Sequence, residues 1–249
     1  MSAAGCTLSA FALRLFPMPD LAFDVQEVRA GSGWLAREGR ERQAELLVAV
    51  LSRFNHDLRT PLNTVVGWTH LLQQGLVDSS RSRHVADVLA RNTREQTVLL
   101  DEFVDDGRAL LGALRLDPVA LRVEDLVARA IERAGPVAAL HAVSFSASVQ
   151  PQDVEVTGDE RRMPRLVFRL LVAVARRARE AGVIELSAAV DGDRVALRVD
   201  APVGQGDWPD ATLLDLQVSS FVAALHDAEL CIDGAPGRAA LVLRMPRRS

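Results

Sequence analysis

The sequence of 249 residues contains no lysine and no tyrosine, and its only cysteines are Cys6 and Cys231. Two cysteines are too few for a disulfide framework or for a zinc site built from cysteines. No apolar run approaches the roughly 18 residues of a membrane-spanning helix, and no basic segment precedes the first apolar stretch, as it would in a secretory signal. We therefore expect a cytoplasmic protein with no membrane partner.

The charge balance is slightly acidic, with a net charge of −4 at pH 7, which argues against a nucleic-acid partner. Hydrophobic residues make up 49% and charged residues 25%, so the chain can bury a sizeable core and global disorder is excluded. Four of the five histidines, namely His70, His84, His141 and His226, form no pattern typical of metal ligands. We expect no metal site.

Composition and periodicity divide the chain into three parts. Residues 1–35 contain scattered apolar residues, prolines and glycines, and we interpret them as a lead-in and linker too short for a core of its own. Residues 36–116 are predicted to form an antiparallel hairpin of two long helices, and residues 117–249 a domain of helices and strands. The predicted fold class is α+β, a helical hairpin followed by a two-layer α/β sandwich.

Both predicted hairpin helices are amphipathic. Apolar residues recur at helical spacing over residues 46–72 and again over residues 85–111, and Asp78 offers an N-cap for the second helix. Because a lone hairpin buries only one side of each apolar stripe, we predict a homodimer in which two hairpins form a four-helix bundle. The alternative is a hairpin that docks on the C-terminal part of its own chain.

The C-terminal part combines helical periodicity with strand-like alternation. Helices are predicted over residues 123–140, 160–181 and 212–226. Strands are predicted over residues 143–149, 183–187 and 194–199, with a last hairpin around residues 234–237. Helices packed on one face of a mixed sheet form a two-layer sandwich.

The residues with the clearest chemical meaning lie in the first predicted helix, where residues 54–63 read FNHDLRTPLN. His56 is followed by the carboxylate of Asp57, and Thr60 lies one turn later on the same face. Pro61 cannot donate a backbone hydrogen bond and is expected to bend the helix. A histidine held in one tautomer by a neighbouring carboxylate is neutral and nucleophilic near pH 7.

This segment resembles the phosphoacceptor box of the histidine kinases of two-component signalling. The resemblance implies that His56 is phosphorylated and that Asp57, which stands where Glu is commonest, assists proton transfer. It also implies that Thr60 positions a water molecule when a partner is dephosphorylated. The resemblance extends over nearly the whole chain after residue 40, and its C-terminal part is similar to the ATP-binding domain of the family, which is of the Bergerat type.

The nucleotide-binding boxes of that domain depart from the family pattern. Ala173 stands where the family has its magnesium-binding Asn, and Ala201 stands at the position of the Asp that reads adenine. Leu213 replaces a glycine of the phosphate loop, and Asp215 places a negative charge where a triphosphate would lie, or caps the helix there. The connection before residue 212 is too short for a complete ATP lid. The resemblance therefore implies a degenerate nucleotide site.

The combination is most similar to dedicated histidine phosphotransfer proteins of phosphorelays. It implies that His56 exchanges a phosphoryl group with the aspartates of response-regulator receiver domains, with no cofactor of its own because the receiver supplies the magnesium ion. By the same resemblance, the receiver would dock on five residues after the phosphoacceptor: Asn63, Thr64, Gly67, Trp68 and Leu71. Trp68 is as readily interpreted as a core residue.

Three other functions remain open. The chain could be an active or atypical sensor kinase that uses ATP, or a phosphatase for a phosphorylated response regulator that depends on Asp57 and Thr60. It could also be a non-catalytic module that binds a regulator or a true kinase. Replacement of His56 distinguishes a relay, which needs the histidine, from the phosphatase and the binding module, which do not.

Overall fold

The computed structural model describes residues 39–203, 210–233 and 237–248. The predicted lead-in of residues 1–35, the shortened lid at residues 204–209 and most of the predicted last turn lie outside these residues. Among the described residues, no helix combines the length and the apolar character needed to cross a membrane.

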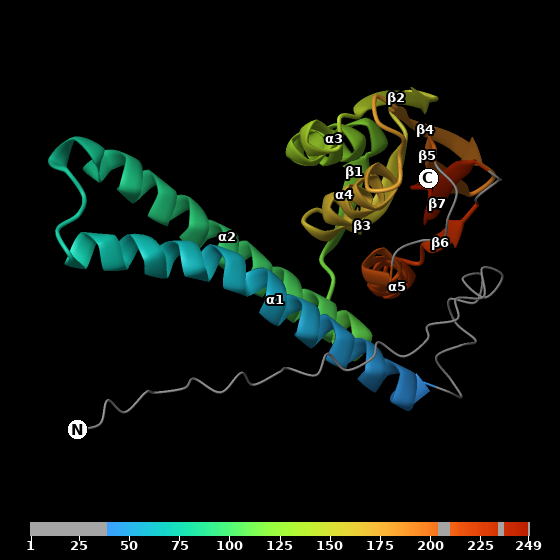
Figure 1. Ribbon diagram of the computed structural model, residues 1–249. Helices are drawn as coiled ribbons and strands as arrows, with labels where there is room; N and C mark the ends of the chain where they lie inside the picture. Colours follow the sequence, from blue (N-terminus) through green and yellow to red (C-terminus); the bar gives the residue numbers. More distant parts are fainter. Residues whose placement is uncertain (1–38, 204–209, 234–236, 249) are drawn as a thin grey trace, which may run out of the picture.

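The N-terminal half of the described chain is a helical hairpin, as predicted. Helix α1 comprises Gly39–Gln73 and continues through Pro61, and helix α2 comprises Ser82–Leu110. The expected N-cap is wrong: Asp78 precedes a short 3-10 helix, Ser79–Arg81, and makes no side-chain capping bond. The turn between α1 and α2 projects far from the rest of the molecule, whereas the other end of the hairpin lies against it (Figure 1).

The described residues of the C-terminal part form seven strands and three helices. In chain order they are β1 (Pro118–Arg122), α3 (Val123–Leu140), β2 (Ser144–Gln150), β3 (Glu155–Asp159), α4 (Arg162–Ala175), β4 (Val183–Asp191), β5 (Arg194–Pro202), α5 (Asp210–Leu225), β6 (Glu229–Ile232) and β7 (Arg238–Pro246). The main sheet has the order β2-β4-β5-β7-β6, with only β2 and β4 parallel, while β1 and β3 form a separate antiparallel pair. The sequence did not predict β1 and β3, and the helix expected to reach residue 181 ends at Ala175.

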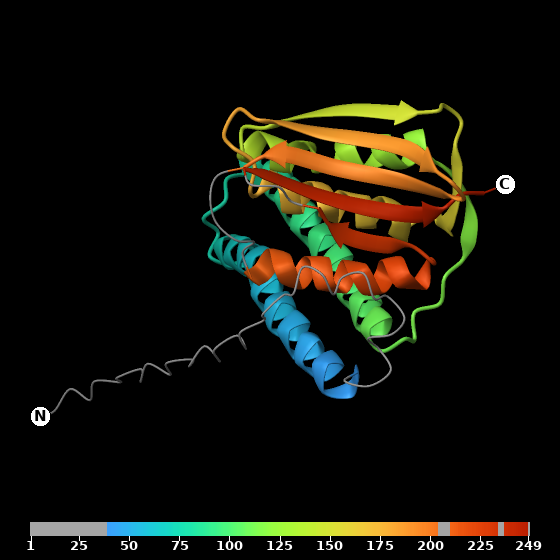
Figure 2. The same ribbon diagram turned by 90° about the vertical axis from the view of Figure 1, so that its right-hand side faces the viewer.

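Helices α3 and α4 cover the face of the main sheet that is turned toward the hairpin (Figure 1). No helix of the described residues covers the other face, and Figure 2 shows the strands in front of α3 and α4. In β4 buried and exposed residues alternate, as expected for a strand with one face in the core. The core between sheet and helices includes Leu166, Leu170, Ile184, Leu197 and Leu243. The predicted α+β class with a two-layer sandwich is thus confirmed.

Helix α5 connects the sandwich to the hairpin. Leu214 and Val218 of α5 form a buried apolar cluster with Leu46, Val50 and Leu110 of the hairpin. Each fully buried side chain of this size contributes about 1.5–3 kcal/mol relative to an exposed one. The end of the hairpin therefore docks on its own chain, the alternative that the periodicity left open.

This contact covers only part of the hairpin. Large apolar side chains remain exposed on both helices in the single chain: Val48, Leu51, Leu62, Val66, Leu72, Val98, Leu100 and Val104. The prediction of a homodimer is not tested by one chain.

Candidate functional site

The imidazole of His56 projects from the solvent-facing side of α1. Its side chain is 84% exposed, and Nδ1 lies 3.2 Å from Oδ1 of Asp57. In the tautomer with the proton on Nδ1, this nitrogen donates to the Asp57 carboxylate and the lone pair lies on Nε2. The imidazole is accessible to a partner, and the phosphoacceptor role of His56 stays a prediction.

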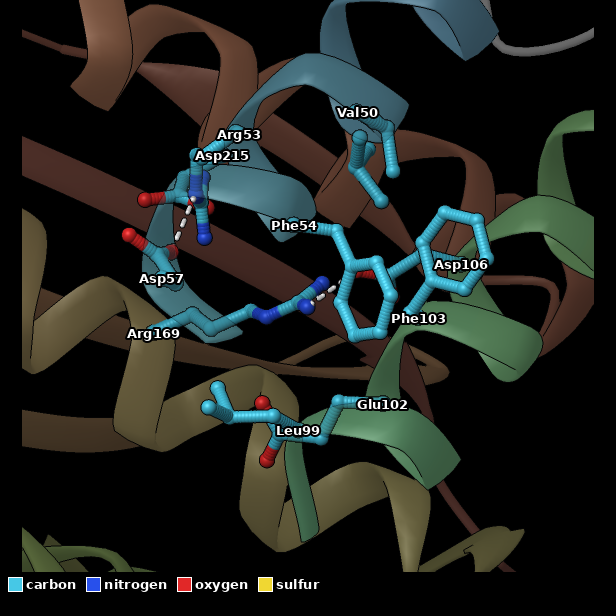
Figure 3. A pocket seen from close by; sticks show the side chains of 11 residues that line it. Val50, Arg53, Phe54, Asp57, Leu99, Glu102, Phe103, Asp106, Arg169 and Asp215 are labelled. Carbon is cyan, nitrogen blue, oxygen red and sulfur yellow. Dashed lines mark hydrogen bonds and ion pairs between the residues drawn. The ribbon is translucent and has the colours of Figure 1, made fainter. Parts of the chain in front are cut away.

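The carboxylate of Asp57 has a second partner, Arg53, one turn earlier in α1. Oδ2 of Asp57 lies 3.4 Å from Nε of Arg53, and Nη1 of Arg53 pairs with Oδ1 of Asp215 in α5 (Figure 3). Burial acts to lower the pKa of the Arg53 guanidinium, but the ion pair with Asp215 outweighs it and raises that pKa. Arg53 therefore stays charged and connects two carboxylates from different parts of the chain.

Thr60 is exposed one turn after His56, on the same side of α1. Its backbone carbonyl accepts a hydrogen bond of 3.2 Å from the hydroxyl of Thr64. The position is compatible with a hydroxyl that faces the same solvent as the imidazole. Its role in dephosphorylation stays a prediction.

The five residues expected to contact a receiver lie on the part of α1 that extends away from the sandwich (Figure 1). Asn63 and Gly67 are exposed, and a Cβ atom added to Gly67 would meet no atom of the described chain within 4 Å. Trp68 is half-buried and packs edge-to-face on His84 of α2, with ring centroids 6.3 Å apart. Trp68 therefore joins the two helices and keeps part of its surface accessible.

The residues at the positions of the predicted degenerate nucleotide boxes are packed in the interior of the sandwich. Ala173 is 2% exposed and Ala201 is 0% exposed, and both belong to the main core of the sandwich. Leu213 is also buried, on α5. The neighbouring Asp200 lies on the other face of β5, where it pairs with Arg238 at 2.8 Å. The described residues therefore do not fit a magnesium nucleotide in the family's usual way, because alanine has no oxygen for a hard cation.

The expectation that Asp215 caps a helix is wrong. Helix α5 begins at Asp210, so Asp215 lies inside it, where no backbone N–H is left to cap. Its two oxygens pair instead with Arg53 and, at 3.6 Å, with Arg176. Of the four positions assigned to the degenerate site, only Asp215 lines the pocket between hairpin and sandwich that Figure 3 shows.

A set of arginines on α4 joins the hairpin to the sandwich. Arg165 and Arg169 bind the two oxygens of Asp106 at 2.9 and 2.5 Å, and Arg162 binds Asp105 at 3.0 Å. Glu102 is a further partner of Arg165, at 3.5 Å. Burial and the neighbouring charge of Arg169 lower the pKa of Arg165 to about 10, so it remains protonated at pH 7.

These ion pairs were not predicted from the sequence. The signal for them is complementary spacing, since acidic residues at 102, 105 and 106 and arginines at 162, 165 and 169 each recur at helical intervals. Periodicity marks these faces as charged but does not tell which helix pairs with which.

No group of three or more His, Cys, Asp or Glu residues in the described part of the chain is arranged to hold a metal ion.

Comparison with known proteins finds histidine kinases that are similar to this chain in sequence. A curated relative is the cell-division control histidine kinase PdhS of Brucella anthropi, 23% identical over 239 residues, which cover 83% of this chain and 23% of PdhS. The PdhS sequence of Brucella suis matches to the same extent. The chain is thus similar to curated histidine kinases. It spans 23% of the length of these curated relatives, and no protein-family model matches it.

Solved histidine kinases share the fold. The Acinetobacter baumannii histidine kinase AdeS matches with a TM-score of 0.59 and 14% identity, over 78% of this chain and 98% of that chain. Full-length ShkA in complex with AMPPNP matches with a TM-score of 0.56 and 23% identity, over 80% of this chain and 46% of that chain. The histidine kinase ThkA in complex with the response regulator TrrA gives a TM-score of 0.55 and 15% identity, over 86% of this chain and 66% of that chain.

Proposed function

We propose that this chain is a histidine-kinase-like protein of two-component signalling in which His56 carries the phosphoryl group. The observation that carries the proposal is the 84% exposed imidazole whose Nδ1 is held by Asp57, 3.2 Å away. In the transfer, the lone pair of Nε2 attacks phosphorus and a phosphorus–nitrogen bond forms. The bond from phosphorus to the leaving oxygen breaks, and its electron pair stays on that oxygen.

Asp57 supports this step in two ways. It orients the ring so that Nε2 faces solvent, and it stabilises the positive charge that the ring acquires when Nε2 becomes substituted. Thr60 is proposed to position a water molecule that hydrolyses the phosphoryl group of a phosphorylated partner. Position, more than covalent chemistry by the protein, governs phosphoryl transfer.

The source of the phosphoryl group separates two candidate functions. The comparisons favour ATP over a dedicated relay, because the relatives named above are histidine kinases and the solved ShkA carries AMPPNP. An atypical kinase is therefore the first candidate, and its nucleotide would have to bind without the side chains that the family uses.

A specific observation keeps the relay as the second candidate. Ala173 and Ala201 are buried in the core and offer no oxygen or adenine-reading group, and Asp215 is engaged with Arg53. In a relay the donor is the phosphorylated aspartate of a receiver domain, which would bring its own magnesium ion. The transfer then needs an accessible His56 and a surface for the receiver, but no nucleotide.

We also propose where the partners bind. The receiver would dock on α1 beyond His56, over Asn63, Thr64, Gly67, Trp68 and Leu71, on the part of the hairpin that extends away from the sandwich (Figure 1). A second copy of the chain would cover exposed apolar residues of the hairpin to complete a four-helix bundle. ThkA, solved with the response regulator TrrA, provides a precedent for such a complex in a protein of similar fold.

One experiment tests the proposal and separates the candidates. Purified protein is incubated with γ-labelled ATP and magnesium, or with a panel of labelled phospho-receivers, and His56→Ala is run beside the wild type. Label on His56 from ATP alone supports the kinase, and label from a receiver alone supports the relay. Label that persists in His56→Ala contradicts the proposal. Loss of phosphate from the receivers that persists in His56→Ala, without any labelled protein, supports a phosphatase instead.

A further inference from the structure

The pocket between hairpin and sandwich ends beside the phosphoacceptor. It is lined by charged residues from both parts of the chain, among them Arg53, Asp57 and Arg169, with Asp215 on the side of α5 (Figure 3). Phe54 and Phe103 stack with ring centroids 4.2 Å apart and form the apolar wall. Charges in such a half-enclosed place interact more strongly than at an open surface.

From this pocket a continuous series of two ion pairs and one hydrogen bond runs from the sandwich to His56. Asp215 of α5 pairs with Nη1 of Arg53, Nε of Arg53 lies 3.4 Å from Oδ2 of Asp57, and Oδ1 of Asp57 lies 3.2 Å from Nδ1 of His56. The two oxygens of Asp57 are thus divided between Arg53 and His56. The carboxylate cannot rotate away from the imidazole without giving up the contact with Arg53.

Exposure falls along the same series. The side chain of His56 is 84% exposed, those of Asp57 and Arg53 are 40% and 36% exposed, and that of Asp215 is 13% exposed. An exposed i,i+4 pair alone holds its geometry weakly. The least exposed member, Asp215, also contacts Arg176, so Arg53 has a fixed partner on a different element of the fold.

We propose that Arg53 is a positioning residue for the phosphoacceptor: held by Asp215 of α5, it fixes the Asp57 carboxylate that orients His56. The docking of the sandwich on the hairpin then sets the reactivity of the histidine, even where the sandwich contributes no nucleotide. This inference rests on the proposed function insofar as His56 takes the phosphoryl group. It goes further by giving the sandwich a role in that transfer.

The test combines a spectroscopic and a kinetic measurement on the full chain. Ring nitrogen chemical shifts of His56, from protein with ¹⁵N-labelled histidine, report the tautomer, and phosphoramidate as a small phosphoryl donor reports the rate without any partner protein. The variants are Arg53→Gln, Arg53→Lys, Asp215→Asn and the double variant Arg53→Gln with Asp215→Asn. Arg115→Gln, an exposed arginine outside the pocket, serves as the matched control.

We expect the wild type and Arg115→Gln to have the proton on Nδ1. Arg53→Gln should give a mixture of both tautomers and an about tenfold slower phosphorylation, a size typical of coupled positions. Arg53→Lys keeps the charge and should restore most of the rate. Asp215→Asn should act in the same direction, and the double variant should be no slower than Arg53→Gln, because both changes break one series of contacts.

Two results overturn the inference. One is an Arg53→Gln variant with the tautomer of the wild type, and the other is an Arg53→Lys variant as impaired as Arg53→Gln despite an unchanged melting temperature. Failure of the proposed function gives a different pattern, in which His56 is phosphorylated in none of the proteins. The tautomer measurement still decides the role of Arg53 in that case.

Discussion

Two regions of this chain differ in how closely they follow the histidine-kinase pattern that the sequence resembles. The segment around His56 follows it closely and lies on an exposed part of α1. The positions at which the resemblance places nucleotide contacts, Ala173 and Ala201, are buried in an apolar core, and Asp215 is engaged by the hairpin. The sandwich therefore has the fold of the solved histidine kinases with apolar residues at these two positions.

The difference shows that fold and chemistry depend on different residues. Helix α4 needs apolar residues facing the sheet, and alanine at 173 meets that need, although it has no oxygen for a magnesium ion. Its arginines on the opposite side bind the acidic residues of α2 instead. Under the proposed function, the sandwich would position the helix that carries His56 through these contacts, whatever the source of the phosphoryl group.

The largest expected effect is the loss of phosphorylation when His56, in the first of the two regions, is replaced. His56→Ala should abolish phosphorylation by any donor, a loss of more than about a thousandfold, because the only accepting nitrogen is removed. Label that is stable to base and labile to acid identifies phosphohistidine. His70→Ala, an exposed histidine farther along α1, should leave the labelling intact. Equal loss in both variants would show that helix integrity, and not the imidazole at 56, is measured.

The contact between the regions is probed by Asp106→Asn. This change removes the carboxylate that Arg165 and Arg169, whose side chains are 10% and 11% exposed, share, and it takes from Arg169 the ion pair with α2, while Arg165 keeps Glu102. Breaking a buried pair in this way costs about 3–5 kcal/mol, measured as the free energy of unfolding in urea. Glu95→Gln, on the exposed side of the same helix, should change little. A loss for Asp106→Asn no greater than for Glu95→Gln would mean that the ion pairs do not hold the two regions together.

The filled nucleotide positions are probed by Ala173→Asn. An amide buried in this apolar core without a partner should cost about 1–3 kcal/mol, seen as a lower melting temperature. Adding ATP and magnesium should not restore the melting temperature of this variant. Recovery of the melting temperature by ATP would show that a nucleotide does reach position 173, and would favour the kinase.

The smallest effect concerns His226, which is 6% exposed at the end of the last helix of the sandwich. Burial lowers its pKa, although the hydrogen bond of 2.7 Å from Nδ1 to the carbonyl of Val222 opposes this. The unfolded chain therefore binds a proton more readily, and the free energy of unfolding should decrease as the pH falls below about 6.5. His226→Gln should flatten that decrease in denaturation curves between pH 7 and 5.5. If the free energy of unfolding of His226→Gln depends on pH as steeply as that of the wild type, other groups cause the decrease.

Much of the fold and part of the site can be predicted from the sequence. The hairpin, helix α3 and the strands flanking residues 192–193 follow from periodicity and turn residues, which are local. Strands β1 and β3 are short and form a separate two-stranded sheet across a long separation in the sequence, so their sequences carry little signal. Arg53 lies one helical turn before Asp57, close to the predicted motif. Its partner Asp215 is 162 residues away in the sequence, and only the docking of α5 on the hairpin brings the two side chains together.

The most direct test of the central claim is the position of phosphorus on the ring of His56. Protein with ¹⁵N-labelled histidine is phosphorylated, and the coupling between phosphorus and nitrogen identifies the bonded atom by NMR. Because Asp57 holds Nδ1, the account predicts a single phosphohistidine with the bond at Nε2 of His56. A bond at Nδ1, or phosphorus on a residue other than His56, would contradict it.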